Sequence, residues 1–261
     1  MPANNKNIVL ISGGASGIGR RTAERFLAQG DAVHICDVSR ERVHDFLAEN
    51  PGATGTVADI GVRDDVGCVF ADFEKLHDHL DVLVNNAGIA GPTAPVDEHD
   101  EAGWDKCIQV NLSGTFYMTK RAVPLLRQNG GGAIINISST AALHGYPLRS
   151  AYVASKWAMM GLMKTWAMEL GPEGIRVNAV CPTSVEGARI DAVIRRDAEQ
   201  RGLSFERVRE IYLRQTSMRT FVTPDDVADT ILFLASAAAS KISGQSISVD
   251  GHTEGLSNWL D

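Results

Sequence analysis

The chain has 261 residues, a length that suits one α/β domain and is short for two. A hydrophobic share of 44% and a charged share of 22% are typical of a globular protein with a sizeable core. The formal net charge of −7 argues against a general affinity for nucleic acid or for an anionic membrane, because both need a basic surface.

The cysteines and the N-terminal residues give no sign of a metal site or of export. The four cysteines form no CxxC pair, and no Cys/His cluster has metal-ligand spacing, so we expect four buried thiols in a reducing compartment and no metal. Residues 1–7 are polar, and no apolar run is long enough to span a bilayer. These features predict a cytoplasmic protein without a membrane partner.

Short β-like runs alternate with longer helical stretches. The first run, 8–11, is apolar and is followed by a glycine cluster, and then by a helix at 20–29 that Gly30 would end. Further runs lie at 32–36, 56–58, 81–84, 133–137, 175–180 and 246–249. This alternation predicts one domain over 1–261, with a doubly wound, parallel, seven-stranded sheet covered by helices on both faces.

One segment, 183–222, interrupts this rhythm because it contains no strand. It is expected to be helical over 188–215, and an insertion between the last strands of such a sheet is typical of a substrate lid. Thr223 and Pro224 then suit the N-cap and the first position of a new helix.

The glycine cluster is a candidate phosphate-binding loop. Its residues, between the first strand and the first helix, are Ser12, Gly13, Gly14, Ala15, Ser16, Gly17, Ile18 and Gly19. Glycines let a diphosphate approach the backbone, and the helix N-terminus that follows attracts the phosphates. The spacing is not GxGxxG, so the loop alone is equally compatible with a tight turn.

Asp37 favours a dinucleotide. It ends the second strand eighteen residues after Gly19, where an acidic side chain can bind the 2′-hydroxyl of a ribose and repel a 2′-phosphate, so NAD is expected and not NADP. Arg20, Arg21 and Arg40 are the counter-argument, since an arginine can hold a 2′-phosphate. We interpret them as solvent-facing helix residues.

Tyr152 and Lys156 form a candidate acid–base pair. Four residues apart, they lie one turn from each other on one helix face, and an ammonium beside a phenol stabilises the phenolate. A pair at this spacing is also common on protein surfaces. Ser139 lies thirteen residues upstream at the end of the fifth strand, and Asn111 lies further back.

Together these motifs resemble the short-chain dehydrogenase/reductase family. The glycine loop is similar to that family's TGxxxGxG loop with serine for threonine, and residues 85–88 are similar to its NNAG motif. Asn111, Ser139, Tyr152 and Lys156 match its catalytic tetrad in order and spacing. The resemblance implies a Rossmann-like fold and an oxidoreductase that exchanges a hydride between a secondary alcohol and a nicotinamide.

The resemblance also implies residue roles. Tyr152 would exchange a proton with the substrate oxygen, which Ser139 would hold. Lys156 would lower the pKa of Tyr152 and bind the nicotinamide ribose, and Asn111 would hold a relay water. The residues implied for cofactor binding are Ser12, Gly13, Ser16, Gly17, Ile18, Gly19, Asp37, Val38, Asp59, Ile60, Asn86, Ala87, Gly88, Tyr152, Lys156, Pro182 and Val185.

The chain departs from the family pattern after the sixth strand. Pro182 is followed by Thr183 where the family usually has glycine, and Gly187 stands where it often has a threonine that contacts the carboxamide of the nicotinamide. The backbone around Val185, or the hydroxyl of Ser184, is the expected substitute.

The lid is basic within an acidic chain. It carries eight arginines and six acidic residues, a net charge of +2. One hypothesis is that lid arginines such as Arg189 meet an anionic group of the substrate, and the alternative is a solvated helix of mixed charge. The residues expected to contact the substrate are Ser139, His144, Arg149, Tyr152 and Arg189, although His144 can equally be an ordinary loop residue.

Three functions follow from these patterns. The first is NAD-dependent oxidation of a sugar, polyol or cyclic alcohol. The second is NADP-dependent ketone reduction, and the third is NAD sensing without turnover, which would not need the tetrad. The helix after Tyr152 is apolar nearly all round, and the resemblance implies a homodimer or homotetramer packed through it and the helix after Asn111, unless the lid covers it. The apolar end of the tail, 257–261, is a further candidate contact.

Overall fold

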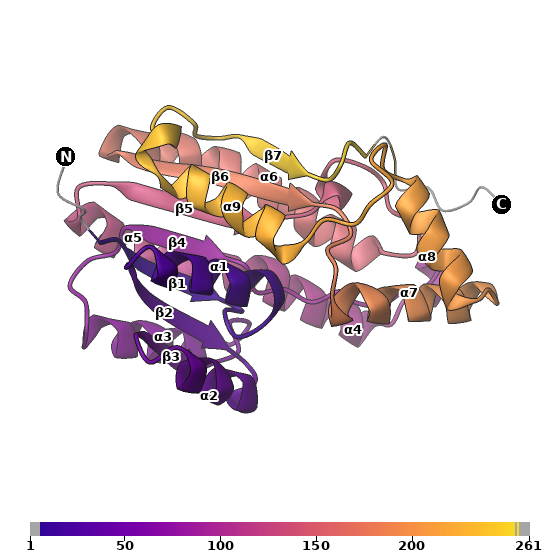
Figure 1. Cartoon of the computed structure of the whole chain (residues 1–261), viewed down its shortest axis with the longest axis horizontal. Coiled ribbons are helices and arrows are strands. Elements are labelled where there is room, and N and C mark those ends of the chain that lie inside the picture. Colours follow the sequence, from indigo (N-terminus) through magenta and orange to yellow (C-terminus); the bar gives the residue numbers. More distant parts are fainter. Residues whose placement is uncertain (1–5, 254, 256–261) are drawn as a thin grey trace.

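A seven-stranded parallel sheet forms the centre of the protein, in a computed structural model that describes residues 6–253 and 255 (Figure 1). The strands lie in the order β3-β2-β1-β4-β5-β6-β7. Their bounds are β1 Ile8–Ser12, β2 Ala32–Asp37, β3 Ala53–Val57, β4 Val82–Asn85, β5 Gly132–Ile137, β6 Ile175–Pro182 and β7 Ser246–Val249. The predicted doubly wound α/β sheet is confirmed.

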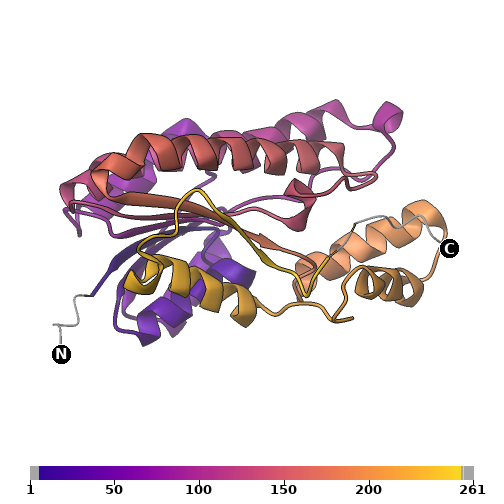
Figure 2. The same cartoon turned by 90° about the horizontal axis from the view of Figure 1, so that it is seen from above.

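Helices cover both faces of the sheet (Figure 2). One layer contains α1 (Gly17–Ala28), α2 (Arg40–Glu49) and α9 (Pro224–Ala235). The opposite layer contains α3 (Arg63–Glu74), α5 (Thr115–Gln128) and α6 (Ser150–Leu170), with the short α4 (Glu101–Ile108) beside α6. No helix in the described part of the chain is long and apolar enough to span a membrane.

The central strands are buried on both sides, which explains why they are apolar runs without alternation. In β1, Val9 and Ile11 pack into the core under α1 and α9, while Leu10 packs into the core under α3, α5 and α6. All three side chains are fully buried. Parallel strands covered on both faces need apolar residues at successive positions, as found here.

The expected burial of all four thiols is wrong for Cys68, which is exposed.

The strand runs were found in the sequence, but several bounds were wrong. The third strand ends at Val57 and begins at Ala53, earlier than the predicted 56–58, and α1 begins at Gly17 instead of residue 20. Glycines have low helix propensity, which hid the first turn of α1 from the sequence pattern. The turn places the free N–H groups of α1 at the end of the loop.

The insertion forms two helices and not one. Gly202, in the left-handed conformation with a φ of 64°, ends α7 (Ala188–Arg201), and the Ser204 hydroxyl then caps α8 (Phe205–Arg214). The expectation of one helical stretch over 188–215 is therefore corrected. The helices share a small core of their own, which includes Val193, Ile194, Val208 and Tyr212. They lie beyond the carboxyl ends of the strands (Figures 1 and 2).

Candidate active site

The loop between β1 and α1 is tied to the end of β4. The Ser12 hydroxyl accepts hydrogen bonds from the N–H groups of Asn86 and Ala87, each at 3.1 Å. In return, the Asn86 side-chain amide donates to the carbonyls of Ser12 at 3.1 Å and Gly13 at 2.9 Å. Two motifs that lie over seventy residues apart in the sequence therefore form one rigid edge of the site.

The geometry of this loop fits a diphosphate. A Cβ at Gly19 would lie 2.2 Å from the Gly13 carbonyl oxygen, so only glycine allows the helix to begin this close to the loop. Gly17 has a φ of 53°, and a Cβ there would meet open space. Within residues 6–253 the Ser16 side chain makes no capping bond, so the first N–H groups of α1 remain available to an anion.

Asp37 is fixed beside this loop. Its carboxylate accepts a hydrogen bond from the Ala15 N–H at 3.3 Å and another from the Ser39 N–H at 3.1 Å. The side chain is 8% exposed, whereas the following Val38 is 68% exposed. An acidic group thus lies at the carboxyl end of β2, next to the phosphate loop, as the ribose of a dinucleotide requires.

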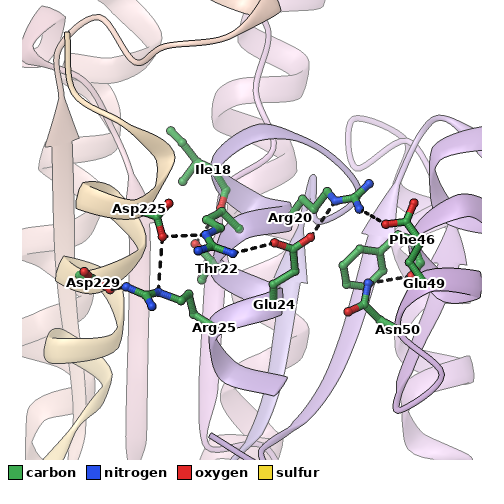
Figure 3. A network of polar contacts seen from close by, with 11 residues as sticks. Ile18, Arg20, Thr22, Glu24, Arg25, Phe46, Glu49, Asn50, Asp225 and Asp229 are labelled. Atoms are coloured by element: carbon green, nitrogen blue, oxygen red, sulfur yellow. Dashed lines mark hydrogen bonds and ion pairs between the residues drawn. The ribbon is translucent and has the colours of Figure 1, made fainter. Parts of the chain in front are cut away.

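Two of the arginines near the loop are already paired with acids (Figure 3). Arg20 forms ion pairs with Glu24 and Glu49, and Arg21 forms ion pairs with Glu24 and Asp225. They join α1 to α2 and α9 and remain partly exposed, so both face solvent as expected, but their ion pairs were not predicted. Arg40, at the start of α2, is exposed as expected.

Asp59 and Ile60, which the family resemblance places beside the adenine of the cofactor, differ in what they offer. The Asp59 carboxylate accepts a hydrogen bond from the Gly61 N–H at 2.8 Å and forms an ion pair with Lys106 at 2.7 Å. Ile60 is 4% exposed and packs in the core, where a Cβ at Gly114 would lie 2.8 Å from its side chain. The Ile60 side chain is therefore occupied, and only its backbone could face a ligand.

Ser139, Tyr152 and Lys156 meet at the carboxyl ends of β5 and β6. The Lys156 ammonium is 5.7 Å from the centre of the Tyr152 ring and donates to the Ile137 carbonyl at 2.8 Å. Ser139 follows β5, and its hydroxyl accepts the Ala141 N–H at 3.1 Å. Ser139 is also close enough to Tyr152 to help lower the pKa of its phenol.

The environment of Tyr152 favours its phenolate. Burial alone would raise the pKa of Tyr152, but Lys156, Arg189, Ser139 and Arg149 together bring it below its ordinary value of 10. Burial also disfavours the charged form of Lys156, which for an amine lowers the pKa, whereas the neighbouring Tyr152 raises it. A phenol poised in this way is suited to accept or return a proton.

Asn111 lies in a π-helical turn, Gln109–Gly114, between α4 and α5. Its side-chain amide donates to the Ile89 carbonyl at 3.0 Å and to Ser155 Oγ at 3.1 Å, and its Oδ1 accepts the Ile89 N–H at 2.7 Å. The side chain thus fixes the segment after β4 against α6. Such turns are frequent at functional sites because they displace backbone carbonyls from the regular helical pattern.

Val185 takes part in a short bridge at the base of the lid. Val222 donates to the Ser184 carbonyl at 3.1 Å, and its own carbonyl accepts the Glu186 N–H at 2.9 Å. In a parallel ladder this leaves the N–H and C=O of Val185 on the opposite side, free for a ligand such as a carboxamide. Pro182 is buried at the end of β6.

Two of the three expected substrate residues beyond the tetrad lie close to Tyr152. Arg149 is 4% exposed, and its guanidinium carbon is 5.2 Å from the centre of the Tyr152 ring. Arg189, at the start of α7, donates to the Gly88 carbonyl at 2.9 Å. His144 lies in the loop that follows Thr140–Ala142, where its N–H donates to the Thr140 carbonyl at 3.1 Å.

Sequence reasoning missed Ser155, which supports the site, and the partner of Tyr146, a residue whose place between Ser139 and Tyr152 already suggested that it could face the pocket. The Ser155 hydroxyl accepts from Asn111 and donates to the Tyr152 carbonyl at 2.7 Å. The Tyr146 hydroxyl donates to Tyr212 of the lid at 2.7 Å. Ser155 could have been noticed inside the Tyr152–Lys156 motif, whereas the partner of Tyr146 depends on how the lid folds.

Comparisons with known proteins agree with this geometry. Residues 13–253 match a family model described as enoyl-(acyl carrier protein) reductase. The chain is 36% identical over 248 residues to the 3-oxoacyl-(acyl-carrier-protein) reductase FabG of Thermotoga maritima, covering 94% of this chain and 96% of that one.

Two solved structures share the fold along nearly the whole chain. NAD+-bound xylitol dehydrogenase superposes with a TM-score of 0.90 at 26% identity, covering 95% of this chain and 98% of that one. A variant actinorhodin polyketide ketoreductase with NADPH gives a TM-score of 0.91 at 29% identity, covering 99% and 100%. This chain belongs to the short-chain dehydrogenase/reductase family, nicotinamide-dependent oxidoreductases that act on alcohol or ketone groups.

Proposed function

We propose that this protein oxidises a secondary alcohol with NAD, and that Tyr152 is the group that takes the proton of the hydroxyl. The observation that carries the proposal is the position of Tyr152 among Lys156, Arg189 and Arg149, which lowers the pKa of its phenol. Ser139 holds the substrate oxygen near Tyr152. When bound, the nicotinamide accepts or supplies the hydride.

Lys156 and Asn111 complete the proton path in this proposal. The Lys156 ammonium stabilises the phenolate and has protons left for the nicotinamide ribose hydroxyls, because within residues 6–253 it donates one hydrogen bond, to the Ile137 carbonyl. The side-chain protons of Asn111 go to Ile89 and Ser155, so the relay water is held by the Asn111 backbone carbonyl. That carbonyl accepts only the Thr115 hydroxyl, at 2.9 Å, among the described side chains.

The preference for NAD rests on Asp37 and on the pairing of its basic neighbours. A 2′-phosphate near the ribose would meet the fixed Asp37 carboxylate, and like charges at close range are unfavourable. Arg20 would have to leave Glu24 and Glu49 to bind the phosphate (Figure 3), and Arg21 would have to leave Glu24 and Asp225. The alternative function is NADP-dependent ketone reduction. In that case the exposed Arg40 would be the cation available to bind the 2′-phosphate.

A single substitution at Tyr152 distinguishes an enzyme from a protein that only senses NAD. Replacing Tyr152 by phenylalanine keeps the ring and removes the acid–base group, so we expect kcat to fall by about 10²–10⁴-fold while NAD affinity is unchanged. Initial rates and a calorimetric NAD titration measure both quantities. A Tyr152→Phe protein with near wild-type turnover on a sugar, polyol or cyclic alcohol would refute the assignment.

We also propose that the protein is a homodimer or homotetramer that packs through α6. Trp157 and Met168 on this helix are 51% and 81% exposed, so the described part of the lid leaves this face uncovered. Large apolar side chains on one exposed face are typical of an interface. Light scattering of the purified protein that gave only the monomer mass would contradict this assembly. The tail at 257–261, the other candidate contact, lies outside the described residues.

A further inference from the structure

Arg149 is a buried cation without a carboxylate partner in the described part of the chain. Its Nη2 donates to the Ala90 carbonyl at 2.8 Å, and its Nε is buried without a hydrogen-bond partner among the described residues. The guanidinium lies over two aromatic rings, 5.2 Å from the centre of Tyr152 and 5.6 Å from that of Tyr146. Burying a charge with an unmade hydrogen bond is costly, so the site is incomplete as it stands.

One acid near this cluster, Asp197, is engaged through its Oδ1, while its Oδ2 is buried without a hydrogen-bond partner among the described residues. Asp197 of α7 lies near enough to affect the pKa of Tyr146 and Tyr212, but it forms an ion pair with Arg201 at 2.8 Å. The hydroxyl of Tyr146 is likewise used, since it donates to Tyr212. Within residues 6–253, therefore, no carboxylate forms an ion pair with Arg149.

The backbone around Arg149 holds the guanidinium in a fixed place. Leu148 has a φ of 64°, an unfavourable conformation for a leucine, and its carbonyl accepts the Ala94 N–H at 3.1 Å. Together with the bond from Arg149 to Ala90, this clamps the residue to the segment that follows β4. A fixed, buried guanidinium is suited to planar recognition of an acidic group.

Arg189 provides a second cation on the lid side. It is exposed, and it donates to Gly88, a residue of the NNAG motif at the end of β4. Arg149 and Arg189 both act electrostatically on Tyr152, so both lie near the place where the substrate hydroxyl must sit. Arg149 comes from the start of the catalytic helix and Arg189 from the lid.

We propose that the substrate carries an acidic group, a carboxylate or a sulfonate, that binds Arg149 and Arg189 while its hydroxyl reaches Tyr152. This rests on the proposed function and narrows its substrate class to short hydroxy acids and the matching oxo acids. The chain between the two groups is short, because the Arg149 guanidinium lies against the Tyr152 ring. The acidic group would supply the countercharge that Arg149 lacks among the described residues.

The test compares acid and ester forms of one substrate. Acetoacetate, its neutral methyl ester and acetonylsulfonate are reduced with NADH by the wild-type protein and by Arg149→Met, Arg149→Lys and Arg189→Met. We expect the wild-type protein to favour the acids, and Arg149→Met to lower kcat/KM for the acids about 10- to 100-fold more than for the ester. Arg149→Lys should recover only part of the loss, because lysine cannot form the guanidinium fork.

The ratio of kcat/KM for the acid to kcat/KM for the ester cancels any general effect of a variant on folding or on Tyr152, because both substrates are turned over by the same protein. Arg196→Met is the matched control, since Arg196 is an exposed α7 arginine that donates to the Ala192 carbonyl of its own helix. Calorimetric binding of butyrate, which has no reacting carbonyl, to the NAD complex gives a readout without turnover. It should weaken in Arg149→Met and Arg189→Met and stay unchanged in Arg196→Met.

The outcomes distinguish this inference from the proposed function. Equal kcat/KM for acid and ester, or a ratio that Arg149→Met does not change, would overturn the acidic-substrate inference and leave the proposed function intact. Failure to bind either cofactor would overturn the proposed function itself.

Discussion

Tyr152 shows how single charges set the chemistry of the site. Its phenol is partly removed from water, which on its own disfavours the charged form, and the nearby cations more than compensate. Lys156 belongs to the same helix, whereas Arg189 belongs to the lid. The acid–base group therefore depends on an element that is not part of the sheet.

That dependence gives a pH prediction. Oxidation needs the deprotonated phenol, so activity is lost as the pH falls through the pKa of Tyr152. Replacing Arg189 by methionine removes a cation that stabilises the phenolate, so the pKa rises and the acid limb of the kcat/KM profile moves to higher pH.

The profile should be measured with a neutral alcohol, so that substrate charge does not enter. Arg196→Met is again the control and should leave the limb in place. An acid limb that Arg189→Met leaves unmoved would show that the lid does not influence Tyr152.

At the scale of elements, the junction of β1, the glycine loop and α1 is the most constrained part of the cofactor end. The ion pairs of Arg20, Arg21 and Arg25 hold α1 against α2 and α9 (Figure 3), while Ser12 and Asn86 hold the loop against β4. The ion pairs are partly exposed, so each contributes little to stability alone. Their effect is to fix the direction of the α1 N-terminus.

A glycine pair tests this constraint. Gly19→Ala would place a Cβ 2.2 Å from the Gly13 carbonyl oxygen, so we expect a lower Tm and NAD affinity reduced by about tenfold or more. Gly171→Ala is the control, because Gly171 has a φ of −57° and a Cβ there meets open space. It should stabilise the protein by about 0.4–1 kcal/mol and leave NAD binding unchanged. Equal behaviour of the two variants in thermal unfolding and titration would contradict the account of the loop.

At the scale of the whole molecule, the site gathers at one edge of the sheet. The strand order reverses between β1 and β4, and ligands of doubly wound sheets bind in the crevice at the carboxyl ends beside such a point. Ser12, Asp37, Asn86, Ser139 and Pro182 end or follow five different strands there. The lid, α7 and α8, lies at the same edge (Figure 2).

This arrangement explains what could be predicted from the sequence. Residues that match motifs, such as Gly19 and Lys156, are fixed by local conformation and chemistry, so their position in the chain indicates their place in the site. The break at Gly202, the pairing of Arg21 with Asp225 and the contact of Tyr146 with Tyr212 depend on how distant segments pack. The burial of Arg149 without a carboxylate partner among the described residues depends on the same packing, so only the structure shows it.

Titration of the purified protein with NAD and with NADP, followed by a screen of secondary alcohols with the tighter cofactor, tests the central claim most directly. We expect NAD to bind at least about tenfold more tightly than NADP, because Asp37 repels a 2′-phosphate, and NADH to form on one of the alcohols. Tighter binding of NADP would contradict the assignment of Asp37, and binding of neither cofactor would contradict the account as a whole.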